Sequence, residues 1–478
     1  MPELVLPGVY IEVRSEALIV SGPISVGNIG IVGTAKSGPI GEVRVLGSYA
    51  EAREVFGAYD AFDNPETANN PLTLVRALEL AYTNGASTVL AVRVTGTEAL
   101  AVGENFIAAW NKNTKARKAS LDIAGVGGTV ATLKARFHGS GGNDIKVAIV
   151  NDPVVAANAI VTIKFGAVEE TYTVPSGNDL VSQVNTQSAL VIGSAGAVGK
   201  PSVLVETPLA GGGSGGDAVD ADYKLGLDQL VNEDAHIIVA AGLDDTVITD
   251  ELKGHVELAS TDKNKRDRIA IVGSRPNASL AQITGHSVSS DRMVFVAPGV
   301  KTTDSASGKP VTLPGAYAAA VVAGMLSARD PHISLTNKSA SVAGLETKFT
   351  PAQLEQMVKN RVLGLEERRG FRVVRGITSD SGAFQQITTR RIVDFAKFGV
   401  RGAADPFIGL LNNNRVRQAL KGSINGFLAS MVDDEMLISY ELDVTATRDE
   451  EIRGIAKVTM TLRPTFSIDF IKVVMFLG

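Results

Sequence analysis

The sequence has 478 residues, more than one compact core usually organises, so we expect two to four domains. It contains no cysteine, which excludes a disulfide framework, a thiol nucleophile and a thiolate metal site. The net charge of −5 and the apolar content of 45% are ordinary for a globular protein, and they give no global sign of binding to nucleic acid or to an anionic membrane.

Residues 1–20 are predicted to form an extended N-terminal arm. Two early prolines disfavour a helix, and apolar residues then alternate with others, with Val9, Ile11 and Val13 on one face and Tyr10 on the other. This is the pattern of a half-buried strand, yet no hairpin turn follows to supply its partner. The arm lacks the basic start and apolar core of a signal peptide, and no apolar run in the chain approaches the ~20 residues that span a bilayer.

Residues 21–100 and 213–349 are predicted to form one discontinuous α/β domain. Nearly continuous apolar runs predict buried strands at 29–35, 87–96, 236–242, 268–274 and 292–299. Stretches with helical spacing of apolar residues lie between them, and the run at 316–326 predicts a buried helix. Such an alternation is typical of a parallel sheet that helices cover on both faces, an α/β sandwich.

Residues 101–212 are predicted to be an inserted, β-rich outer domain. Short alternating or β-branched runs, separated by turn residues, predict five strands, at 132–137, 145–150, 159–165, 170–174 and 202–206. We expect a small all-β domain inserted into the α/β domain. The glycine-rich stretch at 211–217 is predicted to be a flexible linker that closes it.

Residues 350–478 are predicted to form a C-terminal α+β domain that ends in an arm strand. Thr350 followed by Pro351 is typical of a helix start. A second helix is predicted at 413–431, and three closing strands at 437–444, 455–462 and 467–476.

The patterns that would carry catalysis or cofactor binding are missing. None of the five histidines has metal-ligand spacing, and the glycine-rich stretches lack the Gly-Lys-Ser/Thr ending of a phosphate-binding loop. His286, Ser287, Ser289 and Asp291 lie close together, but no GxSxG elbow accompanies them. We therefore predict no catalytic, cofactor or metal site, and a hydrolase or a nucleotide-binding enzyme is the alternative from another class.

Charge is polarised near the C-terminus. Residues 359–421 carry an excess of basic residues and residues 433–451 an excess of acidic ones, which suits layered self-assembly and equally suits pairing within one subunit. On the predicted helix at 413–431, Arg417 and Lys421 flank the apolar stripe and Arg415 lies opposite it, while Gly422 and Gly426 lie on the polar side. Since glycine lowers helix stability by about 1 kcal/mol relative to alanine, this face is suited to the close approach of a partner, although a solvated face remains the simpler alternative.

The last residues are apolar on both faces of the predicted strand. They include Phe470, Ile471, Val473, Val474 and Phe476, with Lys472 as the one charge among them. A free strand of this kind promotes aggregation. It must therefore be a central strand of its own domain or pair with another chain.

Several motifs in order resemble the contractile tail sheath family of phages and phage-like injection systems. They are PGVYIEV at 7–13, GNIGIVGTAKSGPIGEVRVLGS at 27–48, NGASTVLAVRV at 84–94, the segment from 292 to 338, RGFRVVRGIT at 369–378 and RRIVDFAKFGV at 390–400. The resemblance covers nearly the whole chain except the insertion at 101–212, and it offers no catalytic residue to transfer.

The resemblance implies a structural protein and no cofactor. Subunits of this family stack helically around an inner tail tube, and their terminal arms add strands to the C-terminal-domain sheets of neighbouring subunits. The implied intersubunit strand residues are Val9, Tyr10, Ile11, Val13, Phe470, Ile471, Val473, Val474 and Phe476. A C-terminal-domain helix touches the tube in this family, and Arg415, Arg417 and Lys421 are the candidates for that contact by position and charge.

The predicted function is that of a sheath subunit which polymerises and contracts to drive the tube through a cell envelope. The implied partners are other copies of the chain, the inner tail tube protein, and baseplate and tail terminator proteins, with no direct nucleic acid contact and no membrane insertion. The implied location is a virion tail assembled in the bacterial host cytoplasm. The sheath of a bacteriocin or of an extracellular injection system is the alternative within the class.

Overall fold

The computed structural model describes residues 27–57, 72–97, 114–215, 218–305 and 307–477. The chain divides into two compact units, and each is described by itself. The first, called here the α/β unit, comprises Val26–Arg390 together with Ser467–Gly478. The second, called the C-terminal unit, contains Arg391–Phe466. The predicted N-terminal arm, with Val9, Tyr10, Ile11 and Val13, lies outside the described residues.

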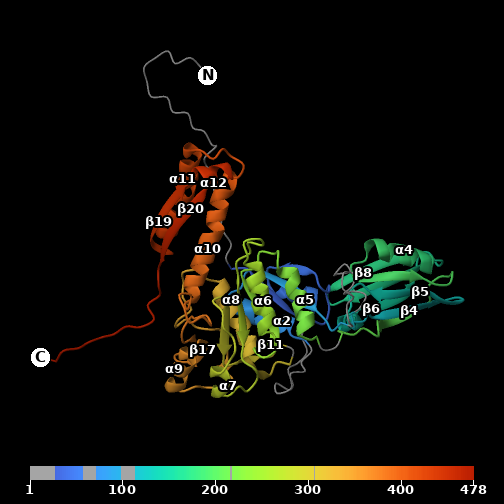
Figure 1. The fold of residues 1–478 in the computed structure, drawn as a ribbon. Helices are drawn as coiled ribbons and strands as arrows, with labels where there is room; N and C mark the ends of the chain where they lie inside the picture. The colour runs from blue at the N-terminus through green and yellow to red at the C-terminus, as the bar shows by residue number, and fades with distance from the viewer. Residues whose placement is uncertain (1–26, 58–71, 98–113, 216–217, 306, 478) are drawn as a thin grey trace, which may run out of the picture. The chain divides into compact units, whose positions relative to one another are not determined.

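An eight-stranded sheet forms the centre of the α/β unit (Figure 1), in the order β18-β17-β13-β12-β11-β1-β3-β2. Its six inner strands run parallel, and the two edge strands β18 and β2 pair antiparallel to their neighbours. The strands are β1 (Ile29–Thr34), β2 (Val43–Leu46), β3 (Val89–Val94), β11 (Ile237–Asp244), β12 (Ile269–Gly273), β13 (Met293–Ala297), β17 (Val362–Glu367) and β18 (Phe371–Val373). The apolar runs at 29–35, 87–96, 236–242, 268–274 and 292–299 thus form strands, as their composition predicts.

Helices bury both faces of this sheet, because side chains alternate between two hydrophobic cores. Ile31 belongs to the core that contains α1 (Tyr49–Phe56), α2 (Leu74–Thr83) and α8 (Gly315–Ser327). Val32, the next residue, belongs to the core that contains α5 (Asp220–Leu230), α6 (Thr249–Ala259), α7 (Leu280–Thr284) and α9 (Pro351–Lys359). The predicted buried helix at 316–326 corresponds to α8, whose residues 315–326 are all buried.

Polar groups inside the α/β unit have specific partners. Arg76 of α2 and Asp304 form an ion pair of 2.9 Å between side chains that are each 1% exposed. This pair ties α2 to the small sheet of β14 (Val300–Thr303), β15 (Pro310–Leu313) and β16 (Gly344–Leu345), because Asp304 directly follows β14. A buried ion pair therefore stabilises the α/β unit in addition to its apolar packing.

The insertion forms two small sheets around a third core. One sheet has the order β10-β6-β7-β8 and the other β4-β5-β9. The elements are β4 (Ser120–Gly125), β5 (Gly128–Ala135), β6 (Lys146–Asn151), β7 (Ala159–Phe165), β8 (Val168–Val174), α4 (Gly177–Gln187), β9 (Val191–Ala195) and β10 (Leu204–Pro208). The expectation of an all-β insertion is wrong, because α4 buries Leu180 and Val184 in the core of the two sheets.

Hydrogen bonds fasten the insertion to the strands beside it. The buried Arg93 of β3 donates to the carbonyl oxygens of Gly38 and His138, and burial lowers the pKa of Arg93 to about 9. The stretch at 211–215 differs from the predicted flexible linker. Its backbone bonds to Arg117 and its Ser214 hydroxyl lies 2.8 Å from that of Ser140, so these residues are held in place.

The C-terminal unit is an α+β arrangement around its own small core. Its elements are α10 (Ile387–Ala404), which begins in the α/β unit, η3 (Asp405–Phe407), α11 (Asn414–Asp433), β19 (Leu437–Thr445), α12 (Arg448–Ile452) and β20 (Lys457–Pro464). Gly399 of α10 permits a close approach, because a Cβ there would lie 1.9 Å from the ring of Phe427 on α11.

Two C-terminal expectations differ from the structure. The predicted domain boundary at 350 precedes α9, β17 and β18, but β17 pairs in parallel with β13 and therefore belongs to the α/β sheet. The predicted third closing strand at 467–476 does not form in the described chain, since those residues have no strand partner there. Among the described helices, none combines the length and the apolar content that crossing a bilayer requires.

Candidate assembly surfaces

The C-terminal segment, defined here as residues 466–477, exposes its apolar side chains. Phe470 and Ile471 are 79% and 82% exposed, and Val473 and Val474 are 73% and 61% exposed. Phe476 is 92% exposed. The segment has no regular secondary structure, and its hydrogen bonds within the described chain run through the side chains of Ser467 and Asp469. These residues therefore follow one another along the chain, and most of their apolar surface is exposed in the described structure.

The C-terminal unit contains a sheet with two unpaired edges. Strands β19 and β20 pair antiparallel along their length and have no further strand neighbour among the described residues. On β20, Val458, Met460 and Leu462 pack against the small core, yet each is only half-buried. A two-stranded sheet with one apolar face is marginal by itself, so this sheet is suited to accept further strands.

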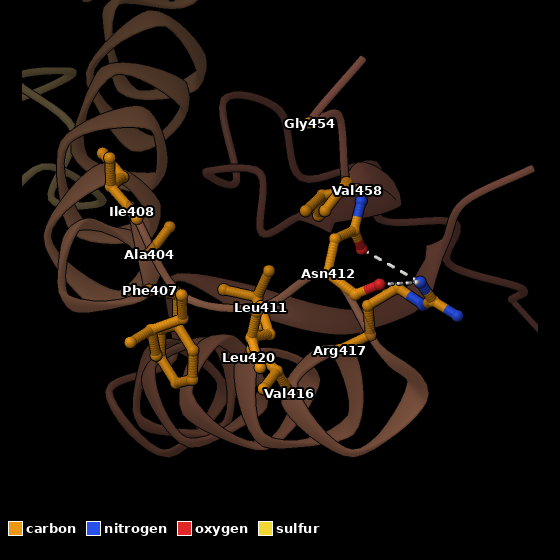
Figure 2. A pocket seen from close by; sticks show the side chains of 13 residues that line it. Ala404, Phe407, Ile408, Leu411, Asn412, Val416, Arg417, Leu420, Gly454 and Val458 are labelled. Carbon is orange, nitrogen blue, oxygen red and sulfur yellow. Dashed lines mark hydrogen bonds between the residues drawn. The ribbon is translucent and has the colours of Figure 1, made fainter. Parts of the chain in front are cut away.

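An apolar pocket of about 300 Å³ lies beside β20 (Figure 2). Phe407, Ile408, Leu411, Val416, Leu420 and Val458 are among the residues that line it. Ile408 and Leu411 are 78% and 77% exposed, although both are large apolar side chains. Arg417 lies at the polar side of the pocket, where it donates to the carbonyl and side-chain oxygens of Asn412. The C-terminal unit thus presents a second apolar surface beside its open sheet.

The three basic candidates on α11 differ in their surroundings. Arg417 is 13% exposed and pairs with Glu451 at 3.0 Å. Lys421 forms a looser pair with Asp443 at 3.3 Å, with both side chains partly exposed. Arg415 is exposed and makes no ion pair with the described residues. The basic and acidic blocks of the sequence therefore pair in part within the subunit, and Arg415 keeps a charge that the described chain leaves accessible.

No close contact within the described chain requires glycine at positions 422 and 426 of α11. A Cβ added at Gly422 or at Gly426 would meet no atom within 4 Å. Their lack of side chains leaves a smooth strip on the exposed side of α11, next to the basic residues. This strip is compatible with the close approach of a partner and equally with a face exposed to solvent.

Two histidines of the described chain, His255 and His286, make structural contacts. Burial and the Arg268 guanidinium lower the pKa of His255 to about 3, and Arg268 lies 3.1 Å from its Nε2. The ring of His286 packs on Phe295, and its Nε2 contacts the carbonyl of Asn360 at 2.9 Å. The described residues contain no group of three or more acidic or histidine side chains that could hold a metal ion.

The residues considered for a hydrolase triad are not arranged as one. Asp291 pairs with Arg390 at 2.9 Å, which leaves its carboxylate engaged away from His286. Neither of the hydrogen bonds that orient these two side chains involves Ser287 or Ser289. A serine nucleophile activated by His286 is therefore not supported by the described geometry.

Comparison with known proteins gives a consistent result. Residues 216–379 match the family described as phage tail sheath protein central domain. The chain is 27% identical over 231 residues to the tail sheath protein of Staphylococcus phage Twort, an alignment that covers 45% of this chain and 37% of the relative. The chain thus spans only about a third of the length of the curated relative that it matches.

Solved structures extend the likeness over nearly the whole chain. The sheath tail protein from Desulfitobacterium hafniense is 18% identical with a TM-score of 0.66, over 96% of this chain and 100% of that chain. The sheath tail protein from Listeria innocua is 15% identical with a TM-score of 0.64, over 92% and 96%. The contracted helical sheath of the anti-feeding prophage is 15% identical with a TM-score of 0.56, over 100% of both chains. The mixed α/β fold is therefore that of sheath proteins, the resemblance read from the sequence motifs is confirmed, and these names describe sheath components and no enzyme.

Proposed function

With the tail sheath central domain at residues 216–379 as the premise, we propose that this chain is the sheath subunit of a contractile tail. It polymerises into a helical tube around an inner tail tube and contracts to drive that tube through a target envelope. The observation that carries the proposal is the exposed apolar C-terminal segment, which occurs on the same chain as a sheet with two open edges. Together they supply a donor and an acceptor for identical copies.

The linkage between subunits is strand addition. The C-terminal segment extends from one copy and pairs with an edge of the β19–β20 sheet of another copy. The residues that pair are Phe470, Ile471, Val473, Val474 and Phe476. Main-chain hydrogen bonds supply the affinity, and burial of the apolar side chains adds about 25 cal/mol per Å². The arm at 1–20, with Val9, Tyr10, Ile11 and Val13, donates a second strand to a neighbouring copy in the same way.

Contraction needs rigid bodies that keep their tethers while they move. The α/β unit, which extends through α9, β17 and β18 to Arg390, supplies the rigid body. The β-rich insertion at 101–212 lies outermost, where its size does not affect the lattice. The C-terminal α+β region carries the acceptor sheet. The stored energy is the packing of an extended lattice that relaxes to a shorter one, so no nucleotide or other cofactor takes part.

Contact with the inner tail tube is assigned to α11. Arg415, Arg417 and Lys421 lie at the start of this helix, and Arg415 is the one of the three without an ion pair among the described residues. The remaining partners are baseplate and tail terminator proteins at the ends of the tube. The subunit assembles in the bacterial cytoplasm and becomes part of the tail.

A virion tail is the first choice, and the sheath of a bacteriocin or extracellular injection system is the second. Likeness to a phage sheath protein supports the former, and likeness to the contracted anti-feeding prophage sheath supports the latter. Capsid and packaging genes beside the coding gene would favour the virion.

Negative-stain microscopy of the purified chain tests the proposal. We expect long striated tubes from the full chain, and folded subunits without ordered tubes after deletion of residues 1–20. Monodisperse particles from the full chain, together with hydrolase or nucleotidase activity, would support the enzyme alternative. Normal tubes from the deleted chain would contradict the role of the arm.

A further inference from the structure

One carboxylate in the C-terminal segment is buried although its neighbours are exposed. The side chain of Asp469 is 6% exposed, whereas Ile468 and Phe470 on either side are 80% and 79% exposed. A buried carboxylate is unfavourable unless it is paired and hydrogen-bonded. The groups that bond to the Asp469 carboxylate therefore determine whether it can remain buried at this position.

Side chains of the α/β unit surround this carboxylate. Arg375 donates from Nε to Oδ2 at 2.8 Å, and Gln386 donates from Nε2 to the same oxygen at 3.3 Å. The hydroxyl of Thr336 donates to Oδ1 at 3.0 Å, and that of Ser467 lies 3.2 Å from it. Both oxygens of Asp469 are thus satisfied, and one of the donors is a full positive charge.

The receiving side is itself organised by the fold. Thr336 Oγ1 accepts from the backbone N–H of Gly376 at 3.1 Å and from the hydroxyl of Ser334 at 3.0 Å, which orients its own proton toward Asp469. The guanidinium of Arg375 also lies 5.5 Å from the ring centroid of Phe470, within the range of a cation–π contact. The site therefore fixes the direction of the chain for one residue beyond Asp469.

The position of this site in the chain is the informative feature. The chain leaves the α/β unit after Arg390 and comes back to it at Ser467. Gln386 lies four residues before the departure, Asp469 lies two residues after the return, and the two side chains bond to each other. Asp469 thus links the segment by which the chain leaves the α/β unit to the segment by which it returns.

We propose that Asp469 is a clasp that fixes the root of the assembly arm on the α/β unit, so that residues 470–477 leave from a set point and reach an identical partner subunit. The inference rests on the proposed function, which supplies the partner. Because the clasp holds the root on the α/β unit, movement of the C-terminal unit does not displace the arm. A fixed root also reduces the conformational entropy lost when the arm binds, which strengthens assembly without any new contact.

The direct readout of this positioning uses the free subunit. The chain has no cysteine, so Lys359→Cys with Lys472→Cys places two spin labels, one on α9 and one in the arm. We expect a narrow distribution of distances in this background and a broad one when Asp469→Asn is added. An equally narrow distribution after Asp469→Asn would overturn the clasp.

The assembly readout compares matched single substitutions. Asp469→Asn should raise the protein concentration needed for tubes at least tenfold and leave the melting midpoint of the subunit nearly unchanged. Glu355→Gln, the same change at an exposed carboxylate on α9, should change neither. Exchange of the pair, as Asp469→Arg with Arg375→Asp, should restore part of the assembly. If Asp469→Asn lowers the melting midpoint as much as it impairs tubes, the residue is structural and the proposal fails.

Truncation after residue 469 separates this inference from the proposed function. Tubes that persist without residues 470–477 would contradict strand donation itself, and with it the clasp. Tubes that vanish on truncation but form normally with Asp469→Asn would contradict the clasp alone.

Discussion

The α/β unit and the C-terminal unit differ in how fully they bury their side chains. In the α/β unit, helices cover both faces of an eight-stranded sheet, and even an arginine such as Arg76 is buried beside its partner. The C-terminal unit has a small core and a sheet of two strands without a further partner among the described residues, and it leaves large apolar side chains such as Ile408 and Ile438 in solvent. The central sheet of the α/β unit is thus covered within one chain, whereas the sheet of the C-terminal unit has open edges among the described residues.

The largest effect is expected from breaking the buried ion pair of the α/β unit. Arg76→Leu leaves the Asp304 carboxylate buried without its charge partner, so the free energy of unfolding should fall by about 3–5 kcal/mol, measured by urea denaturation. The control is Lys146→Gln in the pair with Glu206, whose side chains are 52% and 46% exposed, where a much smaller loss is expected because solvent screens the pair. Equal losses would show that the α/β unit is not the tightly satisfied region described here.

A smaller effect is expected from acid, again in the α/β unit. Burial and Arg268 lower the pKa of His255 to about 3, so the unfolded chain takes up a proton below its ordinary pKa of 6.5 and the folded chain does not. Stability is therefore full above about pH 6.5 and falls toward pH 3, by at most about 1.4 kcal/mol per pH unit for this group.

His255→Gln checks this pH dependence, because glutamine accepts a hydrogen bond without titrating. Urea unfolding between pH 7 and pH 4.5 should show a shallower loss of stability in the variant. Some slope should remain, since burial also lowers the pKa of His138 to about 4. An unchanged slope would contradict the assignment to His255.

The smallest effects on stability are expected from substitutions on α11. They compare Arg417, which forms an ion pair, with Arg415, which is exposed. Arg417→Glu places a like charge beside Glu451 and should lower the free energy of unfolding by about 1–2 kcal/mol. Arg415→Glu should change it by less than about 0.5 kcal/mol, because this side chain is exposed and unpaired in the described chain.

Co-sedimentation with the inner tube separates the two arginines functionally. Arg415→Glu should weaken assembly on the tube although the subunit keeps its stability. If assembly is unchanged with Arg415→Glu and with Lys421→Glu, α11 is not the tube contact.

Much of the secondary structure follows from local pattern. The apolar runs at 236–242 and 268–274 are strands because both of their faces are buried, and Thr350 caps α9 by accepting from the backbone of Gln353. The sequence pattern does not predict helix α4, because Leu180 and Val184 stand in a polar stretch and become buried only against the sheets that pack around them.

The assembly residues show where sequence reasoning stops. The alternation of Val9, Ile11 and Val13 lies outside the described residues, and strand exchange through either terminus stays a proposal. The clasp had no signal in the sequence, since Asp469, Arg375, Gln386 and Thr336 lie far apart along the chain and only the fold brings them together.

The amino-acid pattern by itself determined the α/β class, the position of the buried helix α8, the apolar character of the chain end and the resemblance to sheath proteins. These properties depend on local periodicity and composition, which a sequence states directly. Tertiary structure decided that α9 and β17 belong to the α/β unit and that Asp469 pairs with Arg375. It also decided that Arg417 forms an ion pair, whereas Arg415 forms none with the described residues. Pairing and burial depend on contacts between distant residues, and those exist only once the chain has folded.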